Sequence, residues 1–154
     1  SPADGFSVRD RAGVDAVSAP QPIPLGVYAR LVAARPAGLV VCVTGGRDFT
    51  NAAIVNRALD KIHAYKPISM LVNGGATGAD ALARAWAKAN RIETHTEGAL
   101  WALYGKRAGP IRNGVMVGFA PDLVVAFPGG AGTRDMVTKS VQAGLQVVHI
   151  TDLG

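Results

Sequence analysis

The sequence contains a single cysteine, few aromatic residues and no apolar stretch of membrane-spanning length. Cys42 has no partner for an intrachain disulfide, and its place inside an apolar run is typical of a small buried thiol. No signal-peptide core opens the chain. We therefore expect a protein of the reducing cytoplasm that has no membrane partner.

Patterns for metal binding and nucleophilic catalysis are also lacking. His63, His95 and His149 are scattered along the chain without the spacing of metal ligands. Cys42 falls within a predicted strand, and no Ser–His–Asp or Cys–His system is evident. We expect neither a metal site nor a cofactor.

The composition is that of an ordinary globular domain, with 49% apolar and 18% charged residues in 154. The formal net charge of +5 favours an anionic partner, and it fits free nucleotides and nucleic acid equally well, although it could serve solubility alone. Five basic residues lie in or beside glycine-bearing segments: Arg47, Lys106, Arg107, Arg112 and Arg134.

The chain divides by pattern into an extension and a regular domain. Residues 1–37 lack clear periodicity, contain several prolines and are expected to be partly irregular, although a short helix over Leu25–Ala34 is compatible with them. Residues 38–154 alternate short apolar runs with amphipathic stripes of helical spacing.

The apolar runs predict five strands, at Leu39–Val43, Ile68–Val72, Ile92–Thr96, Leu123–Phe127 and Gln146–Ile150. Strands that alternate with helices indicate right-handed βαβ units and a parallel sheet covered on both faces. The expected fold is thus α/β, a Rossmann-like doubly wound sheet of about five mainly parallel strands flanked by helices. Asp48 or Thr50 is placed to cap the first helix of this domain, and Asn90 offers a left-handed residue after the second. Gly144 should end the last helix.

Three glycine-rich loops follow three of these strands, at residues 44–48, 73–80 and 128–133. Loops after parallel strands meet at the carboxyl edge of the sheet, where ligands bind. Each loop also enters a helix, so its amides and the helix dipole can receive a phosphate or carboxylate. A tight strand-to-helix turn is the alternative interpretation of any one loop. Neither the Walker pattern nor a dinucleotide Gly-x-Gly-x-x-Gly is present.

The candidate ligand-binding residues are Gly45, Gly46, Arg47, Gly74, Gly75, Ala76, Asp80, Arg112, Asn113, Pro128, Gly129, Gly130, Ala131, Gly132 and Thr133. Among them, Arg112 offers a guanidinium fork for phosphate or carboxylate, and Asn113 a contact to a sugar hydroxyl or a base edge. Asp80 either benefits from the helix dipole or accepts from ribose hydroxyls.

Other residues keep two interpretations open. Arg134 and Asp135 form either a surface ion pair or a phosphate clamp with its orienting group. The segment that carries Trp101 and Tyr104 could fold over the site and stack a ring on a base, but packing against the domain is the preferred interpretation.

Four motifs then occur in order, at residues 44–49 (Thr-Gly-Gly-Arg-Asp-Phe), 74–80, 108–113 and 128–133. This set resembles the SLOG superfamily, which includes the Lonely-guy phosphoribohydrolases and the DprA/Smf DNA-processing proteins, and it is most similar to the small bacterial YspA-like branch. The resemblance covers about residues 38–152. It implies a Rossmann-like domain that binds a nucleotide or nucleotide-derived ligand and forms homo-oligomers.

The resemblance bears on activity through one motif, Pro-Gly-Gly-x-Gly-Thr-x-x-Glu. In the hydrolase relatives its Glu and an Arg assist cleavage of the base–ribose bond. Here Met136 stands at the Glu position, and Asp135 lies one residue earlier. Our leading hypothesis is a binding or sensing module. The alternatives are an N-glycosidic hydrolase of nucleoside 5′-monophosphates, with Arg112 and Asp135 as catalytic residues, and a DprA-like binder of single-stranded DNA.

Overall fold

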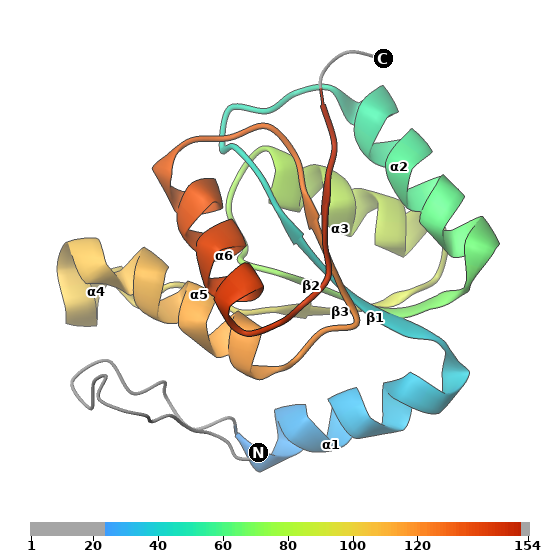
Figure 1. Ribbon diagram of the computed structural model, residues 1–154, viewed down its shortest axis with the longest axis horizontal. Coiled ribbons are helices and arrows are strands. Elements are labelled where there is room, and N and C mark those ends of the chain that lie inside the picture. Colours follow the sequence, from blue (N-terminus) through green and yellow to red (C-terminus); the bar gives the residue numbers. More distant parts are fainter. Residues whose placement is uncertain (1–23, 152–154) are drawn as a thin grey trace.

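Five parallel strands form one sheet in the computed structural model, which describes residues 24–151 (Figure 1). The strand order is β3-β2-β1-β4-β5. The strands are β1 Leu39–Thr44, β2 Ile68–Asn73, β3 Glu93–Thr96, β4 Leu123–Ala126 and β5 Val147–His149. The predicted α/β fold is therefore confirmed, and no strand end lies more than one residue from its predicted position.

The sheet is covered on both faces, which explains why its central strands are continuous apolar runs rather than alternating ones. Along β1, Val41 and Val43 belong to one core, whereas Val40 and Cys42 belong to the other. The Sγ of Cys42 lies 3.9 Å from the Sδ of Met116, and burial raises the pKa of this thiol. Cys42 is thus the buried thiol that the sequence predicts.

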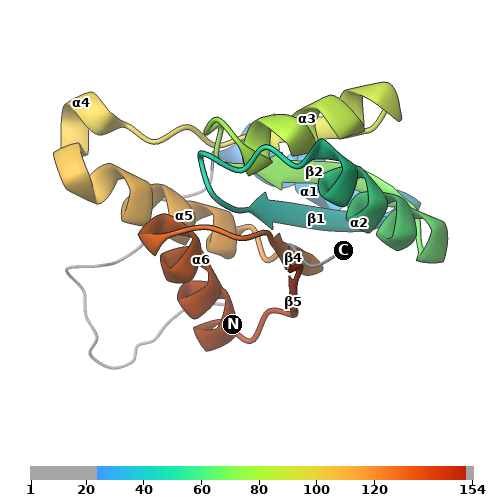
Figure 2. The ribbon, with the colours of Figure 1, turned by 90° about the horizontal axis from the view of Figure 1, so that it is seen from above.

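Two groups of helices cover these faces, and Figure 2 shows the green helices on one side of β1 and the orange and red helices on the other. The helices α2 (Ala52–Tyr65) and α3 (Ala79–Ala89) pack over the first core. The helices α1 (Leu25–Ala34), α5 (Ala108–Gly118) and α6 (Ala131–Gln142) pack over the second. A short helix, α4 (Trp101–Tyr104), precedes α5, and 3₁₀ turns occupy Arg35–Ala37 and Gly105–Arg107.

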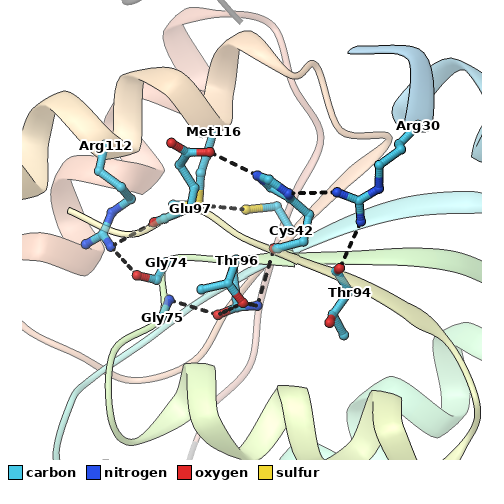
Figure 3. Close-up of polar contacts among 11 residues, drawn as sticks. Arg30, Cys42, Gly74, Gly75, Thr94, Thr96, Glu97, Arg112 and Met116 are labelled. Carbon is cyan, nitrogen blue, oxygen red and sulfur yellow. Dashed lines mark hydrogen bonds and ion pairs between the residues drawn. The ribbon is translucent and has the colours of Figure 1, made fainter. Parts of the chain in front are cut away.

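The helix α1 shows how the described part of the predicted extension joins the domain. Leu31 is buried against the second core. The guanidinium of Arg30 donates to the Thr94 carbonyl at 3.1 Å (Figure 3). It also donates to Glu93 at 2.9 Å, and the two contacts tie α1 to β3. Residues 1–23 of the predicted extension lie outside the described residues, and the division at residue 37 stays a prediction.

Two predicted helix ends are wrong, and both errors are local. Asn51, rather than Asp48 or Thr50, caps α2, because the helix begins at Ala52 and the Asn51 side chain accepts from the Ile54 amide at 3.1 Å. After α3 the left-handed residue is Arg91, with φ 57°, and not Asn90. Asn90 has φ −98°, and its side chain donates to the Trp86 carbonyl at 2.8 Å.

The end of α6 agrees with the prediction, since this helix stops at Gln142, just before Gly144. Within residues 24–151, none of the helices combines the length and apolar character that crossing a membrane requires.

Candidate functional site

The strand order creates a crevice at the carboxyl ends of β1 and β4. The chain leaves β1 toward β2 and β3, and it builds the other half of the sheet from β4 onward. The loops after these two adjacent strands therefore run to opposite faces, which opens a binding crevice between them. A cavity of about 830 Å³ lies here.

Most of the predicted site residues line this cavity. They are Gly45, Gly46, Arg47, Ala76, Asp80, Arg112, Asn113, Pro128, Gly129, Gly130, Ala131, Gly132, Thr133 and Asp135. Gly74, Gly75 and Arg134 are not among its lining residues. The structure thus brings the first and third loops together around one cavity. The second loop contributes Ala76 and Asp80 to its lining.

The loop after β1 is held between the other two loops by backbone contacts at Gly46. Its amide donates to the Pro128 carbonyl at 2.8 Å, and its carbonyl accepts from the Ala79 amide at 3.1 Å. Gly78 has φ +75°, and a Cβ there would overlap the Gly46 carbonyl oxygen. Several loop glycines are therefore required by the close approach of one loop to another. This agrees with the alternative interpretation of each loop as a tight strand-to-helix turn.

Gly130 and Gly132 differ from these glycines. A Cβ added at either would meet no atom of the described residues within 4 Å, and neither has a positive φ, yet both line the cavity. At Gly129, in contrast, a Cβ would overlap Thr133 Oγ1. Packing therefore accounts for Gly129 but not for Gly130 or Gly132.

The third loop leads directly into α6, whose N-terminus borders the cavity. Gly130 is its N-cap and makes no side-chain cap, and the first α6 amide that bonds back is that of Arg134, to Gly130 at 3.0 Å. Within the described part of the chain, the amides of residues 131–133 donate no hydrogen bond. Such amides, together with the helix dipole, favour an anion.

Arg112 reaches across from α5 to the second loop. It donates to the Gly74 carbonyl and, at 3.5 Å, to the Glu97 carbonyl (Figure 3), while its Nε donates to Asn113 Oδ1 at 3.0 Å. Burial lowers the pKa of Arg112; the nearby Asp80 charge opposes this, and Arg47 adds to it. Gly74 thus contacts Arg112 and does not line the cavity. A Cβ at Gly74 would overlap the guanidinium.

Asp80 holds the second loop in place. Its Oδ2 accepts from the amides of Gly74 at 3.0 Å and Ala76 at 3.2 Å, and the side chain is buried. Burial raises the pKa of this carboxyl, although the hydrogen bond from Ala76 and the charge of Arg112 act in the opposite direction. Asp80 is therefore a loop-supporting residue that also borders the cavity.

Asn113 connects α5 with α6 under the cavity. Its amide nitrogen donates to the Gly132 carbonyl at 3.2 Å and to Asp135 Oδ2 at 3.0 Å. Lys139 then donates to both oxygens of Asp135, at 2.6 and 2.7 Å. The partner of Asp135 is thus Lys139 one turn along α6, and not Arg134, the neighbour with which the sequence pairs it.

Trp101 joins the cavity lining, although the sequence favoured packing against the domain. This residue is 47% exposed, and the Arg47 Cζ lies 5.2 Å from its ring centroid. Tyr104 instead borders a separate small pocket of about 110 Å³. Lys106 also lines the main cavity, and its place among basic residues near the glycine motifs was the available signal. Other lining residues absent from the predicted set are Val43, Thr44, Asp48, Phe49, Gly109, Pro110 and Met116.

Comparisons with known proteins agree with this architecture. Residues 39–104 match the model of a family described as "YspA, cpYpsA-related SLOG family". The Gene 61 protein of Mycobacterium phage D29 is 36% identical over 120 residues, which are 73% of this chain and 96% of that relative.

An X-ray structure of DNA processing protein A (DprA) from Streptococcus pneumoniae is similar in fold. The TM-score is 0.59 at 18% identity, over 72% of this chain and 50% of that one. The chain therefore spans about half the length of DprA, and the similarity concerns the fold alone. Together with the doubly wound sheet and its four ordered motifs, the family match and the phage relative show that this chain belongs to the YspA, cpYpsA-related SLOG family.

Proposed function

We propose that this protein binds a nucleotide or nucleotide-derived small molecule and acts as a binding or sensing module. The observation that carries the proposal is the open glycine surface at Gly130 and Gly132. Both line the cavity beside the uncapped start of α6, and the packing of the described residues requires glycine at neither position. A phosphate at that surface would explain the absence of side chains, because a Cβ would hold it away from the amides.

The other walls of the cavity supply charge that suits the same ligand. Arg47, Lys106 and Arg112 all line it. Arg47 and Arg112 act on each other as like charges, since Arg47 contributes to the lowered pKa of Arg112. An anion bound between the basic residues and the start of α6 would relieve this repulsion.

Binding without cleavage is favoured by the state of the residues that hydrolysis would use. Met136, at the Glu position of the hydrolase motif, is fully buried in the second core. Asp135, the alternative carboxylate, already accepts from Asn113 and from Lys139 through both oxygens. Asp135 lines the cavity, but its contacts with Asn113 and Lys139 compete with a role as general acid or base toward a substrate.

The experiment is a thermal-shift panel with nucleoside monophosphates, ADP-ribose, NAD, cyclic nucleotides and short single-stranded DNA. A ligand at about a hundred times its dissociation constant adds roughly 2.7 kcal/mol to the free energy of unfolding, enough to raise the midpoint by several degrees. We expect a selective rise with one class of nucleotide.

Two glycine variants make the test specific for the α6 loop. Gly132→Ala and Gly114→Ala both place a methyl group in open space within a helix, and only Gly132 lines the cavity. Each should raise the free energy of unfolding by up to about 1 kcal/mol, because alanine is the better helix former. We expect Gly132→Ala alone to weaken nucleotide binding. Equal binding in both variants would contradict the proposed phosphate position, and a salt-sensitive shift with DNA alone would favour the DNA-binding alternative.

A further inference from the structure

Trp101 occupies an unusual position for a large aromatic side chain. It begins the short helix α4, lines the cavity and leaves 47% of its surface exposed. The other tryptophan, Trp86, is 4% exposed and donates its indole N–H to Asp60 at 2.8 Å. Core packing therefore accounts for Trp86 but not for Trp101.

The indole of Trp101 is supported on one side by α5. Its Cη2 lies 3.4 Å from the position that a Cβ of Gly109 would take, so the ring edge rests against the first turn of that helix. Gly109 also lines the cavity. A ring held in this way offers a flat apolar wall to whatever enters the space.

One face of the ring is covered by the guanidinium of Arg47, with 5.2 Å between Cζ and the ring centroid. Within residues 24–151, this guanidinium has no hydrogen-bond acceptor and no ion pair. It also shares the cavity with Arg112, which carries the same charge. A planar cation stacked on an aromatic ring without further partners is readily displaced, since such exposed contacts are weak.

We infer that Trp101 is the base-stacking residue of this site, which selects ligands that carry a planar heteroaromatic base. The base takes the ring face that Arg47 now covers, and Arg47 turns to the anionic part of the same ligand. The inference rests on the proposed function, since it assigns the base end of a ligand whose phosphate lies at α6. A cavity of about 830 Å³ has room for both ends, because small-ligand pockets span roughly 300–1,000 Å³.

The experiment compares AMP, GMP, CMP and UMP with ribose 5-phosphate, which carries the same phosphate and sugar without a base. Binding is measured by calorimetry and by tryptophan fluorescence, in which buried Trp86 supplies a constant signal. We expect the nucleotides to bind more tightly than ribose 5-phosphate and to quench Trp101, with purines ahead of pyrimidines because of their larger stacking area.

Variants separate stacking from a structural role. Trp101→Ala should weaken nucleotide binding by about 5- to 150-fold, the range for loss of one stacked base, and leave ribose 5-phosphate binding unchanged. Trp101→Phe should keep the preference for nucleotides over ribose 5-phosphate. Leu103→Ala is the matched control, because Leu103 lies in the same short helix, is 69% exposed and does not line the cavity.

The outcomes distinguish this inference from the proposed function. Equal affinity for nucleotides and ribose 5-phosphate, with no effect of Trp101→Ala, would overturn base stacking and leave phosphate binding standing. Equal weakening of both ligands in Trp101→Ala would also overturn it, because Trp101 would then act on the site as a whole. Failure of these compounds and of every nucleotide in the thermal-shift panel to bind would overturn the proposed function and the inference with it.

Discussion

The side-chain amide of Asn113 donates to the carboxylate of Asp135 at 3.0 Å and thereby joins α5 to α6 beneath the cavity. The same amide nitrogen donates to the Gly132 carbonyl, and its oxygen accepts from Arg112. One buried side chain thus fixes the cationic wall of the cavity relative to the start of α6.

Removal of this link should cost stability. Asn113→Ala leaves the Arg112 Nε, the Gly132 carbonyl and one Asp135 contact without their partner, and buried polar groups that lose a partner cost about 1–3 kcal/mol. Urea unfolding should show a lower midpoint at an unchanged m-value. The control is Asn56→Ala, at an exposed position of α2, where a change within about 0.5 kcal/mol is expected. Equal changes in the free energy of unfolding of the two variants would contradict a stabilising role of the Asn113 hydrogen bonds.

Two adjacent glycines of the third loop should respond differently to alanine. At Gly129 a Cβ would overlap Thr133 Oγ1 and lie 2.7 Å from the Gly46 amide nitrogen, whereas at Gly130 it would meet nothing within 4 Å. Gly129→Ala should therefore lower the free energy of unfolding by about 1–3 kcal/mol, and Gly130→Ala should change it little. Thermal and urea denaturation of both variants check this difference. A larger loss at Gly130 would show that the loop is packed differently.

Stability should depend on pH through Asp80. Burial raises the native pKa of its carboxyl above the ordinary value of 3.8, so folding favours the protonated form. The stability that this group contributes is complete below the unfolded pKa and is lost as the pH rises through the raised native pKa.

Asp80→Asn provides the reference for that titration, because its amide oxygen can still accept from the amides of Gly74 and Ala76. We expect the wild type to lose stability relative to Asp80→Asn as the pH rises across this window, and the difference to become constant above it. Urea unfolding of both proteins at several pH values from about 3 to about 7 measures this. A difference that grows in the opposite direction would mean that the hydrogen bonds and Arg112 outweigh burial.

Cleavage of nucleotides should be absent. Met136 is buried where the hydrolase motif carries Glu, and the carboxylate of Asp135 is engaged by Lys139 at 2.6 Å. We therefore expect no free base to be released from any nucleoside monophosphate, as followed by chromatography over long incubation. Release of base that disappears in Asp135→Asn, with binding retained, would instead establish the hydrolase alternative.

Much of the fold could be predicted because its signals are local. The apolar run at Leu39–Val43 belongs to a strand with both faces covered, and such a run needs no knowledge of its neighbours. The glycine-rich loops after these strands likewise indicated the carboxyl edge before any contact was known, since all loops after parallel strands lie there. Asn51 was missed as a helix cap because adjacent polar residues compete for that role, and only the start of the helix decides among them.

The sequence by itself determined the alternation of strands and helices, the family and the edge of the sheet at which the loops gather, since these follow from periodicity and short motifs. Only the tertiary structure decided which glycines serve packing and which leave open surface. The Cβ of Gly129 is excluded by Thr133 within the same loop, but a Cβ at Gly78 is excluded by Gly46 from another loop. It also decided that Asn113 joins α5 to α6 and that Trp101 faces the cavity. Such contacts depend on how separate segments meet in space, and no spacing along the chain encodes that meeting.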